Sequence, residues 1–191
     1  MKIQFPISYQ EFRENYFEKK PLLMKGAISQ KDLLSWKSIN EILPRCDLIS
    51  EDAIKVMHKG KRAHKKDYLE EYNDLGTIRY KFQEENLYSF LRDGATLVAN
   101  GIVNEPSVDC FSQEIAQFTG CHIFSSLYIA FNTQRSFKSH WIVVIFLQFK
   151  CRVKSVGLFT LQHLKNHCLC IVVKICLNML LILMMYIWIL Y

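Results

Sequence analysis

The sequence predicts an α+β domain in which helices pack around a sheet. Helix signals dominate the first half of the chain, and β-rich runs follow at 95–102 and 121–131. Helices first and strands later are typical of that class. The chain has 191 residues, which is room for one domain rather than two.

The N-terminal segment carries the first helix signal. Ser8 and Glu11 stand at capping-box spacing just before an apolar run that starts at Phe12. This spacing predicts a helix start, because the two side chains can accept hydrogen bonds from the free N–H groups of the first turn. Residues 21–26 then predict a short apolar strand that a glycine closes.

A second capping box stands further along, at Ser38 and Glu41. It predicts a short helix that ends near Pro44, because proline restricts the residue before it to extended backbone. Residues 53–58 follow as a candidate strand. Three further elements are expected after these: a helix at 85–91, a strand at 95–102 and an amphipathic helix at 107–118.

The composition divides the chain into two unlike parts. Residues 1–141 hold 19 Lys and Arg against 18 Asp and Glu, whereas residues 142–191 hold five Lys and Arg and no acid. The net charge of +6 therefore comes mostly from the second part and is poor evidence for nucleic-acid binding. Cys46, Cys110 and Cys121 show neither metal nor disulfide spacing, so a cytoplasmic location is expected.

One basic stretch, residues 58–66, has two interpretations. It could contact RNA phosphate or an acidic partner. It could also be a solvated loop. No aromatic residue interleaves with the basic ones, which weakens the case for a surface that binds single strands.

Three segments together resemble the JmjC/cupin-like oxygenases, and most closely the bacterial type that hydroxylates ribosomal protein. Residues 12–27 resemble the entry helix of the family and the strand after it. Residues 93–99 and the helix expected at 107–118 resemble the portion that comes next in the sequences of this family. Residues 126–141 resemble the first core strand and the loop before the H-x-D motif, with His140 where that motif begins. The resemblance covers about residues 5–141.

The resemblance implies a metal site at His140. Non-haem Fe(II) oxygenases hold iron with two His and one carboxylate, which leaves positions for 2-oxoglutarate and O₂. In H-x-D the two ligands are two residues apart on a strand and point to the same face. Here Ile142 takes the position of the carboxylate, and no Asp or Glu follows it. His163 and His167 remain, but nothing places them on a matching strand.

The tail from Ile142 has two competing explanations. A single-base frameshift after the Trp141 codon accounts for the abrupt change, and one restored reading completes an H-W-D motif after His140. In that case 1–141 is the N-terminal part of the oxygenase domain and 142–191 is an aberrant tail. Alternatively, 168–191 is a tail anchor, because about 20 apolar residues suit a bilayer. Either way, an exposed apolar segment seeks a membrane or aggregates.

The family fold is a double-stranded β-helix, a jelly-roll barrel with flanking helices. By resemblance the chain holds the N-terminal helices and leading strands of that truncated barrel. The implied activity is hydroxylation of a ribosomal or other basic protein with Fe(II) and 2-oxoglutarate, and the break at Ile142 predicts that this chain is inactive. The alternative is a non-catalytic membrane-anchored or interaction protein.

Overall fold

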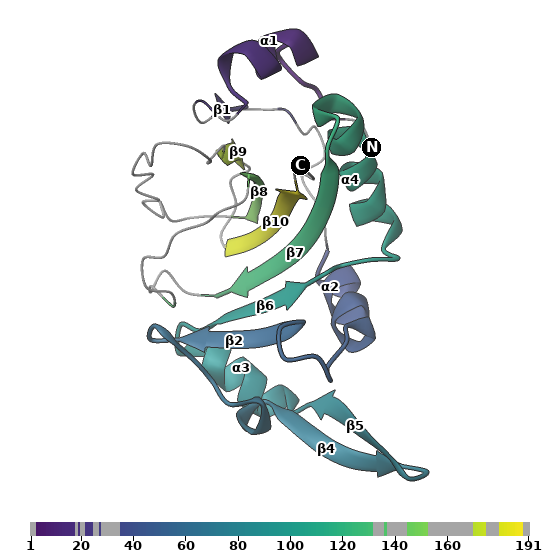
Figure 1. Cartoon of the computed structure of the whole chain (residues 1–191). Coiled ribbons are helices and arrows are strands. Elements are labelled where there is room, and N and C mark those ends of the chain that lie inside the picture. The colour runs from purple at the N-terminus through teal and green to yellow at the C-terminus, as the bar shows by residue number, and fades with distance from the viewer. Residues whose placement is uncertain are drawn as a thin grey trace.

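A computed structural model gives the fold of the chain (Figure 1). It describes residues 3–17, 19, 22–24, 27, 35–131, 136, 145–152, 170–174 and 180–188. Helices pack beside a mostly antiparallel sheet, so the predicted α+β class is confirmed.

The first helix, α1 (Tyr9–Asn15), begins where the capping box predicts. The Ser8 hydroxyl accepts a hydrogen bond from the Glu11 amide at 3.1 Å. This bond satisfies one of the N–H groups that a helix start leaves without an intrahelical partner. The helix buries Phe12 completely. The strand expected after it is present as β1 (Leu22–Leu23).

The start of the second helix differs from the prediction. Helix α2 (Trp36–Ile42) is capped by Ser35, not by Ser38. The Ser38 amide donates to the Ser35 hydroxyl at 3.0 Å, which places Ser38 inside the first turn. A serine that stands three residues before another serine can be the cap itself, and the sequence does not separate the two. The 3-10 turn η1 (Leu43–Arg45) contains Pro44 and ends the helix.

Besides β1, four described strands of the main sheet come from the first part of the chain. They are β2 (Ile54–His58), β3 (Lys61–Arg62), β6 (Thr96–Asn100) and β7 (His122–Ala130). Each pairs antiparallel with its neighbour, in the spatial order β7-β6-β2-β3. The strands expected at 53–58, 95–102 and 121–131 are therefore confirmed with slightly shorter bounds.

Two helices cover one face of these strands. Helix α3 (Glu84–Arg92) contacts β6 and helix α4 (Pro106–Thr119) contacts β7. Both helices stop before a glycine with left-handed backbone, Gly94 at φ 85° and Gly120 at φ 71°. Beneath the helices, Ile54, Ala99 and Leu127 form one cross-strand row that is fully buried.

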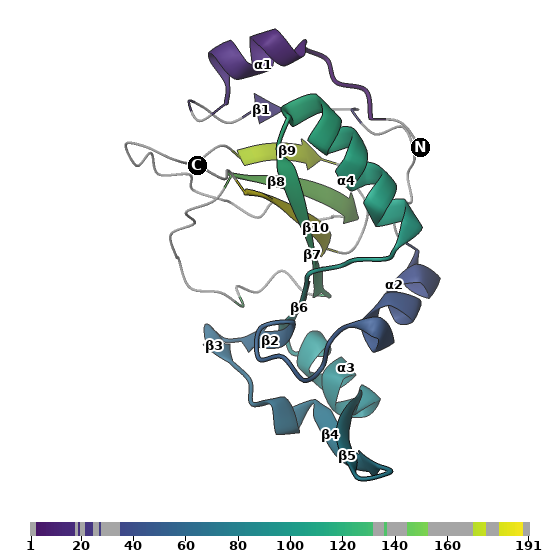
Figure 2. The ribbon, with the colours of Figure 1, turned by 45° about the vertical axis from the view of Figure 1, so that its right-hand side comes forward.

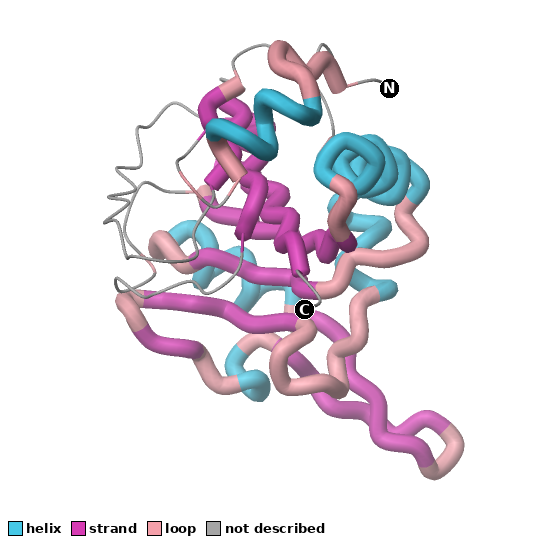
Figure 3. Tube along the Cα trace, turned by 45° about the horizontal axis from the view of Figure 1, so that its top comes forward, coloured by secondary structure: helices cyan, strands magenta, loops and turns pink. Residues whose placement is uncertain are grey.

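The sequence did not predict the hairpin of β4 (Leu69–Asp74) and β5 (Thr77–Phe82). These strands pair only with each other, and they follow the short 3-10 turn η2 (Lys65–Asp67). The hairpin extends away from the rest of the molecule (Figure 3). Its tight turn is made by Leu75 and Gly76, both with positive φ.

The described parts of the tail form three strands of the main sheet (Figure 2). They are β8 (Ile145–Arg152), β9 (Cys170–Lys174) and β10 (Leu180–Trp188). Strand β10 pairs antiparallel with β7 over its whole length, and β9 pairs parallel with both β8 and β1. None of the described helices is both long and apolar enough to cross a membrane.

Candidate functional site

The main sheet has a second face that is turned away from α4. In an antiparallel pair, residues directly opposite each other point to the same side. Lys55, Val98 and Tyr128 form such a row across β2, β6 and β7. Ser125 is three residues before Tyr128 on β7, so the two side chains point to opposite sides of the sheet. Ser125 faces α4, where its hydroxyl lies 3.0 Å from that of Ser112. Lys55 and Tyr128 therefore lie on the opposite side, which we call the open face.

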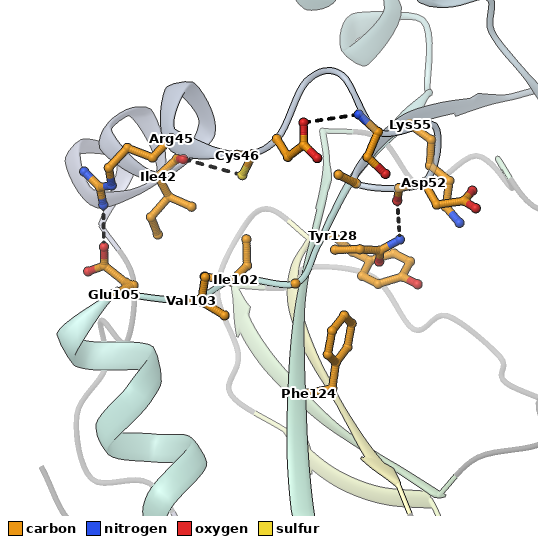
Figure 4. A pocket seen from close by; sticks show the side chains of 15 residues that line it. Ile42, Arg45, Cys46, Asp52, Lys55, Ile102, Val103, Glu105, Phe124 and Tyr128 are labelled. Carbon is orange, nitrogen blue, oxygen red and sulfur yellow. Dashed lines mark hydrogen bonds and ion pairs between the residues drawn. The ribbon is translucent and has the colours of Figure 1, made fainter.

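A pocket of about 700 Å³ lies at one end of the open face (Figure 4). Its lining comes from the α2–β2 connection, the start of β2, the end of β6 with the loop after it, and β7. The lining residues are Ile42, Arg45, Cys46, Asp47, Ser50, Asp52, Ala53, Lys55, Asn100, Gly101, Ile102, Val103, Glu105, Phe124 and Tyr128. We call it the open-face pocket.

Most charged groups of this pocket are already engaged. Arg45 Nη2 lies 2.7 Å from Glu105 Oε2 on the far wall (Figure 4). Asp47 accepts hydrogen bonds from two backbone amides of its own turn. Asp52 faces Arg62 at 3.5 Å. Lys55 is half-buried and makes no ion pair within the described part of the chain, so it is the cation that a ligand would meet.

The pocket thiol is protected from ionisation. Cys46 is half-buried and its Sγ donates to the Ile42 carbonyl oxygen at 3.5 Å. Burial raises the pKa of Cys46 to about 11, and the nearby Arg45 opposes that rise only in part. A thiol with so high a pKa is almost entirely protonated at neutral pH. Cys46 is therefore a packing residue and not a nucleophile.

No metal centre is formed by the residues that the structure describes. Within those ranges, no three His, Cys, Asp or Glu side chains come together in a group that could hold an ion. The predicted ligand position His140 and the blocking residue Ile142 both lie outside the described residues. The structure therefore places neither of them.

Ser136 shows where the chain goes before it reaches His140. The Ser136 hydroxyl lies 2.5 Å from that of Thr96 at the start of β6, and its carbonyl oxygen accepts from the Gly60 amide at 3.0 Å. Thr96 is opposite Ala130 in β7, two residues along from the Val98–Tyr128 pair, so its side chain is on the open face. The segment after β7 thus returns to the open face four residues before His140.

The basic stretch 58–66 is largely neutralised by the fold. His58 Nε2 and Lys59 Nζ each lie 2.9 Å from Asp93 Oδ2. The hydrogen bond from Lys59 holds the pKa of the exposed Asp93 carboxyl below its usual range. Arg62 faces Glu51 and Asp52. These contacts favour a structural role over a surface that binds RNA phosphates, because Lys59, Arg62 and Lys65 already have carboxylate partners.

Lys65, in the same stretch, closes the loop before β2. Its ammonium donates to three carbonyl oxygens, those of Leu48, Ile49 and Ser50, at 3.1, 2.8 and 2.9 Å. Lys65→Met keeps the aliphatic stem and removes all three bonds. We expect it to lower the free energy of unfolding by about 1.5 kcal/mol, the lower end for hydrogen bonds to a charged group, because water can reach the loop. Chemical denaturation followed by circular dichroism measures this loss.

The exposed neighbour Lys66 provides the matched control. Lys66→Met removes the same charge at a solvent-facing position, and we expect a change within about 0.5 kcal/mol. Equal losses in the two variants would contradict the role given to Lys65.

The chain matches no protein-family model, no curated protein and no solved structure. The site must therefore be judged from its own residues. Sequence reasoning missed Lys55 and Tyr128. One available signal was the charged residue at the second position of the otherwise apolar run Ile54–Met57, which marks one side of that strand as not fully buried.

Proposed function

We propose that this chain derives from a 2-oxoglutarate-dependent protein hydroxylase of the JmjC/cupin-like type and is itself without oxygenase activity. The observation that carries the proposal is the position of Ser136. Ser136, which belongs to the segment with the family-like sequence, contacts Thr96 on the open face, and His140 follows it four residues later in the sequence. A metal ligand at this point would lie at the concave side of a barrel built on this sheet.

The antiparallel strands β7, β6, β2 and β3, with α3 and α4 on one side, also support this origin. A double-stranded β-helix encloses its site between two sheets, and here β6 and β7 would belong to one of them. The ancestral substrate class by resemblance is a ribosomal or other basic protein. In the intact family, bound Fe(II) and 2-oxoglutarate supply the oxidising chemistry.

The residues of this chain do not fit that iron centre. His140 is one ligand of three, and Ile142 offers no donor atom where the family has a carboxylate. No group in the described residues replaces it. The open-face pocket is also a poor site for a dianion, because its three carboxylates outnumber its two cations. We therefore derive no catalytic step for this chain.

The test is succinate formation by the full chain with Fe(II), 2-oxoglutarate and O₂. We expect no succinate above the protein-free blank, and no difference between the wild type and His140→Ala. Succinate that depends on His140 would overturn the proposed inactivity. The nucleotide sequence around the Trp141 codon tests the origin of the tail: if no single-base shift opens a family-like frame, the frameshift explanation of 142–191 fails.

The alternative function is a membrane-anchored or interaction protein, which the apolar composition of 168–191 favours. It predicts carbonate-resistant partition into membranes that is lost when 168–191 is deleted. Under the hydroxylase-derived proposal, the described parts of this segment, β9 and β10, are strands of the main sheet and not a membrane anchor. Deletion would then reduce the folded fraction rather than release the chain from membranes.

A further inference from the structure

The hairpin of β4 and β5, residues 69–82, is an exposed arm. Its base is fixed, because Tyr68 and Leu69 are buried and the Gln83 amide donates to the Tyr68 carbonyl oxygen at 3.0 Å. Beyond the base most side chains are exposed on both sides of the hairpin. Within the described part of the chain no strand pairs with either outer edge. An open edge presents backbone donors and acceptors to which another strand can pair.

The outer part of the arm carries exposed apolar side chains. Leu75 is fully exposed and has a φ of 50°, a left-handed conformation that disfavours a leucine. Tyr72 is 40% exposed and Ile78 is 53% exposed. A leucine that buries nothing in this chain and holds a disfavoured backbone conformation is available for contact with another molecule.

Charge is segregated between the two strands of the arm. Glu70 lies 3.2 Å from Lys81, and Asp74 lies 2.6 Å from Arg79. In both pairs the carboxylate is on β4 and the cation on β5. Side chains alternate along a strand, so Glu70 and Asp74 share one face of β4 with Tyr72 between them.

The surroundings of the arm strengthen the acidic character of β4. Residues 67–85 contain six acidic and two basic residues, in a chain whose net charge is +6. Each carboxylate can accept more than one hydrogen bond, so Glu70 and Asp74 can take a second cation on the free edge. The complement of this edge is therefore a basic strand.

We propose that β4 takes up an extended basic segment of another protein as a third strand of the arm. Backbone pairing supplies the attachment, and alternate side chains supply the selectivity. The expected pattern is a Lys or Arg opposite Glu70, an apolar residue opposite Tyr72 and a second Lys or Arg opposite Asp74. The proposal uses no residue of the open-face pocket and does not depend on the hydroxylase origin.

A second copy of this chain fits the edge less well. A symmetric pairing of β4 with β4 sets carboxylates against carboxylates, and like charges directly opposite each other destabilise a strand pair. A symmetric pairing of β5 with β5 sets Arg79 and Lys81 against their own copies. The segregated charges thus disfavour both symmetric self-pairings, and the acidic edge of β4 favours a basic partner strand.

The experiment uses the full chain and a fluorescent, end-capped peptide with the core Lys-Thr-Leu-Thr-Lys, followed by fluorescence anisotropy. Glu70→Gln with Asp74→Asn removes both charges from β4 and keeps oxygen acceptors for Lys81 and Arg79. We expect about fivefold weaker binding of the peptide, the sum of two exposed ion pairs. A peptide methylated on alternate backbone nitrogens is expected to bind weakly to the wild type.

The matched control is Glu84→Gln with Glu85→Gln, which removes two exposed charges from the first turn of α3. We expect its affinity for the peptide to equal that of the wild type. Equal weakening by both double variants would overturn the proposal, because binding would then follow net charge alone. Full binding of the methylated peptide would overturn it as well. Sedimentation gives a third outcome against the proposal. If the wild type dimerises and Glu70→Gln with Asp74→Asn abolishes the dimer, the edge pairs with a second copy of this chain and not with a basic segment.

Discussion

Phe12→Ala is expected to lower the free energy of unfolding by about 3–5 kcal/mol, the usual cost of removing a buried phenylalanine. Phe12 is fully buried and lies where α1 meets α4: its ring centroid is 5.3 Å from that of Phe118 and 5.7 Å from that of Phe17. Phe5 stacks on the other side of Phe118 at 3.8 Å. Truncation leaves a cavity among aromatic rings that cannot collapse without moving a helix.

Domains are commonly stable by only about 5–15 kcal/mol, so this loss would remove a large part of the margin. Urea denaturation of the full chain measures it. Tyr9→Ala is the control in the same helix: Tyr9 is half-exposed, and we expect a change within about 0.5 kcal/mol. A loss below about 1 kcal/mol for Phe12→Ala would mean that α1 is not part of the core.

The sequence predicted those elements whose ends carry local chemistry. Ser8 was found because a hydroxyl before an apolar run has few other interpretations. The ends of α3 and α4 were found because Gly94 and Gly120 supply the left-handed backbone that stops a helix. The prediction that Ser38 caps α2 was wrong because Ser35 offers an equivalent hydroxyl one turn earlier.

The hairpin at 69–82 was missed because its turn signal is absent and only one of its strands alternates. Its turn is Leu75-Gly76 and not Asn-Gly or Asp-Gly, and Glu70-Glu71 interrupts the alternation of apolar and polar residues on β4. On β5 the apolar residues Ile78, Tyr80 and Phe82 do alternate with polar ones, but β4 has no matching apolar row to complete a hairpin pattern.

The strands of the tail could not be predicted for a different reason. Runs such as 170–173 and 180–188 are continuously apolar, and periodicity cannot separate a buried strand from a membrane helix in such runs. The long antiparallel pairing of β10 with β7 joins residues at least 50 positions apart. Only the tertiary structure can supply that contact. Lys55 and Tyr128 were likewise brought together by the register of β2, β6 and β7 and not by any motif.

The second large expected effect is a gain in metal affinity at the proposed ligand position His140. Ile142→Asp restores a carboxylate two residues after His140, so that both donors can point to the same face of a strand. We expect Co(II), a stand-in for Fe(II) that resists oxidation, to bind at least about tenfold more tightly to this variant than to the wild type. Even partners of the ligands change metal affinity by about 10–100-fold, and a new ligand should do no less.

Visible absorption of bound Co(II) and calorimetric titration measure the gain. Other His and Cys side chains of the chain also take up Co(II), so the comparison must be between variants. Ile142→Asn offers a side chain of similar size with a far weaker donor and should gain little. His140→Ala combined with Ile142→Asp should lose the gain, because the new carboxylate then has no histidine beside it. A gain that survives the loss of His140 would contradict the assignment of position 140.

The same variant separates metal binding from catalysis. Ile142→Asp still lacks the second histidine that the family takes from a later strand, and neither His163 nor His167 has a sequence context that supplies it. An oxygenase site needs three protein donors on one face to hold iron while leaving room for its co-substrates. We therefore expect tighter metal binding without succinate formation. Under the proposed hydroxylase origin, that result would place the loss of activity in the sequence after Trp141 and not in the 141 residues before it.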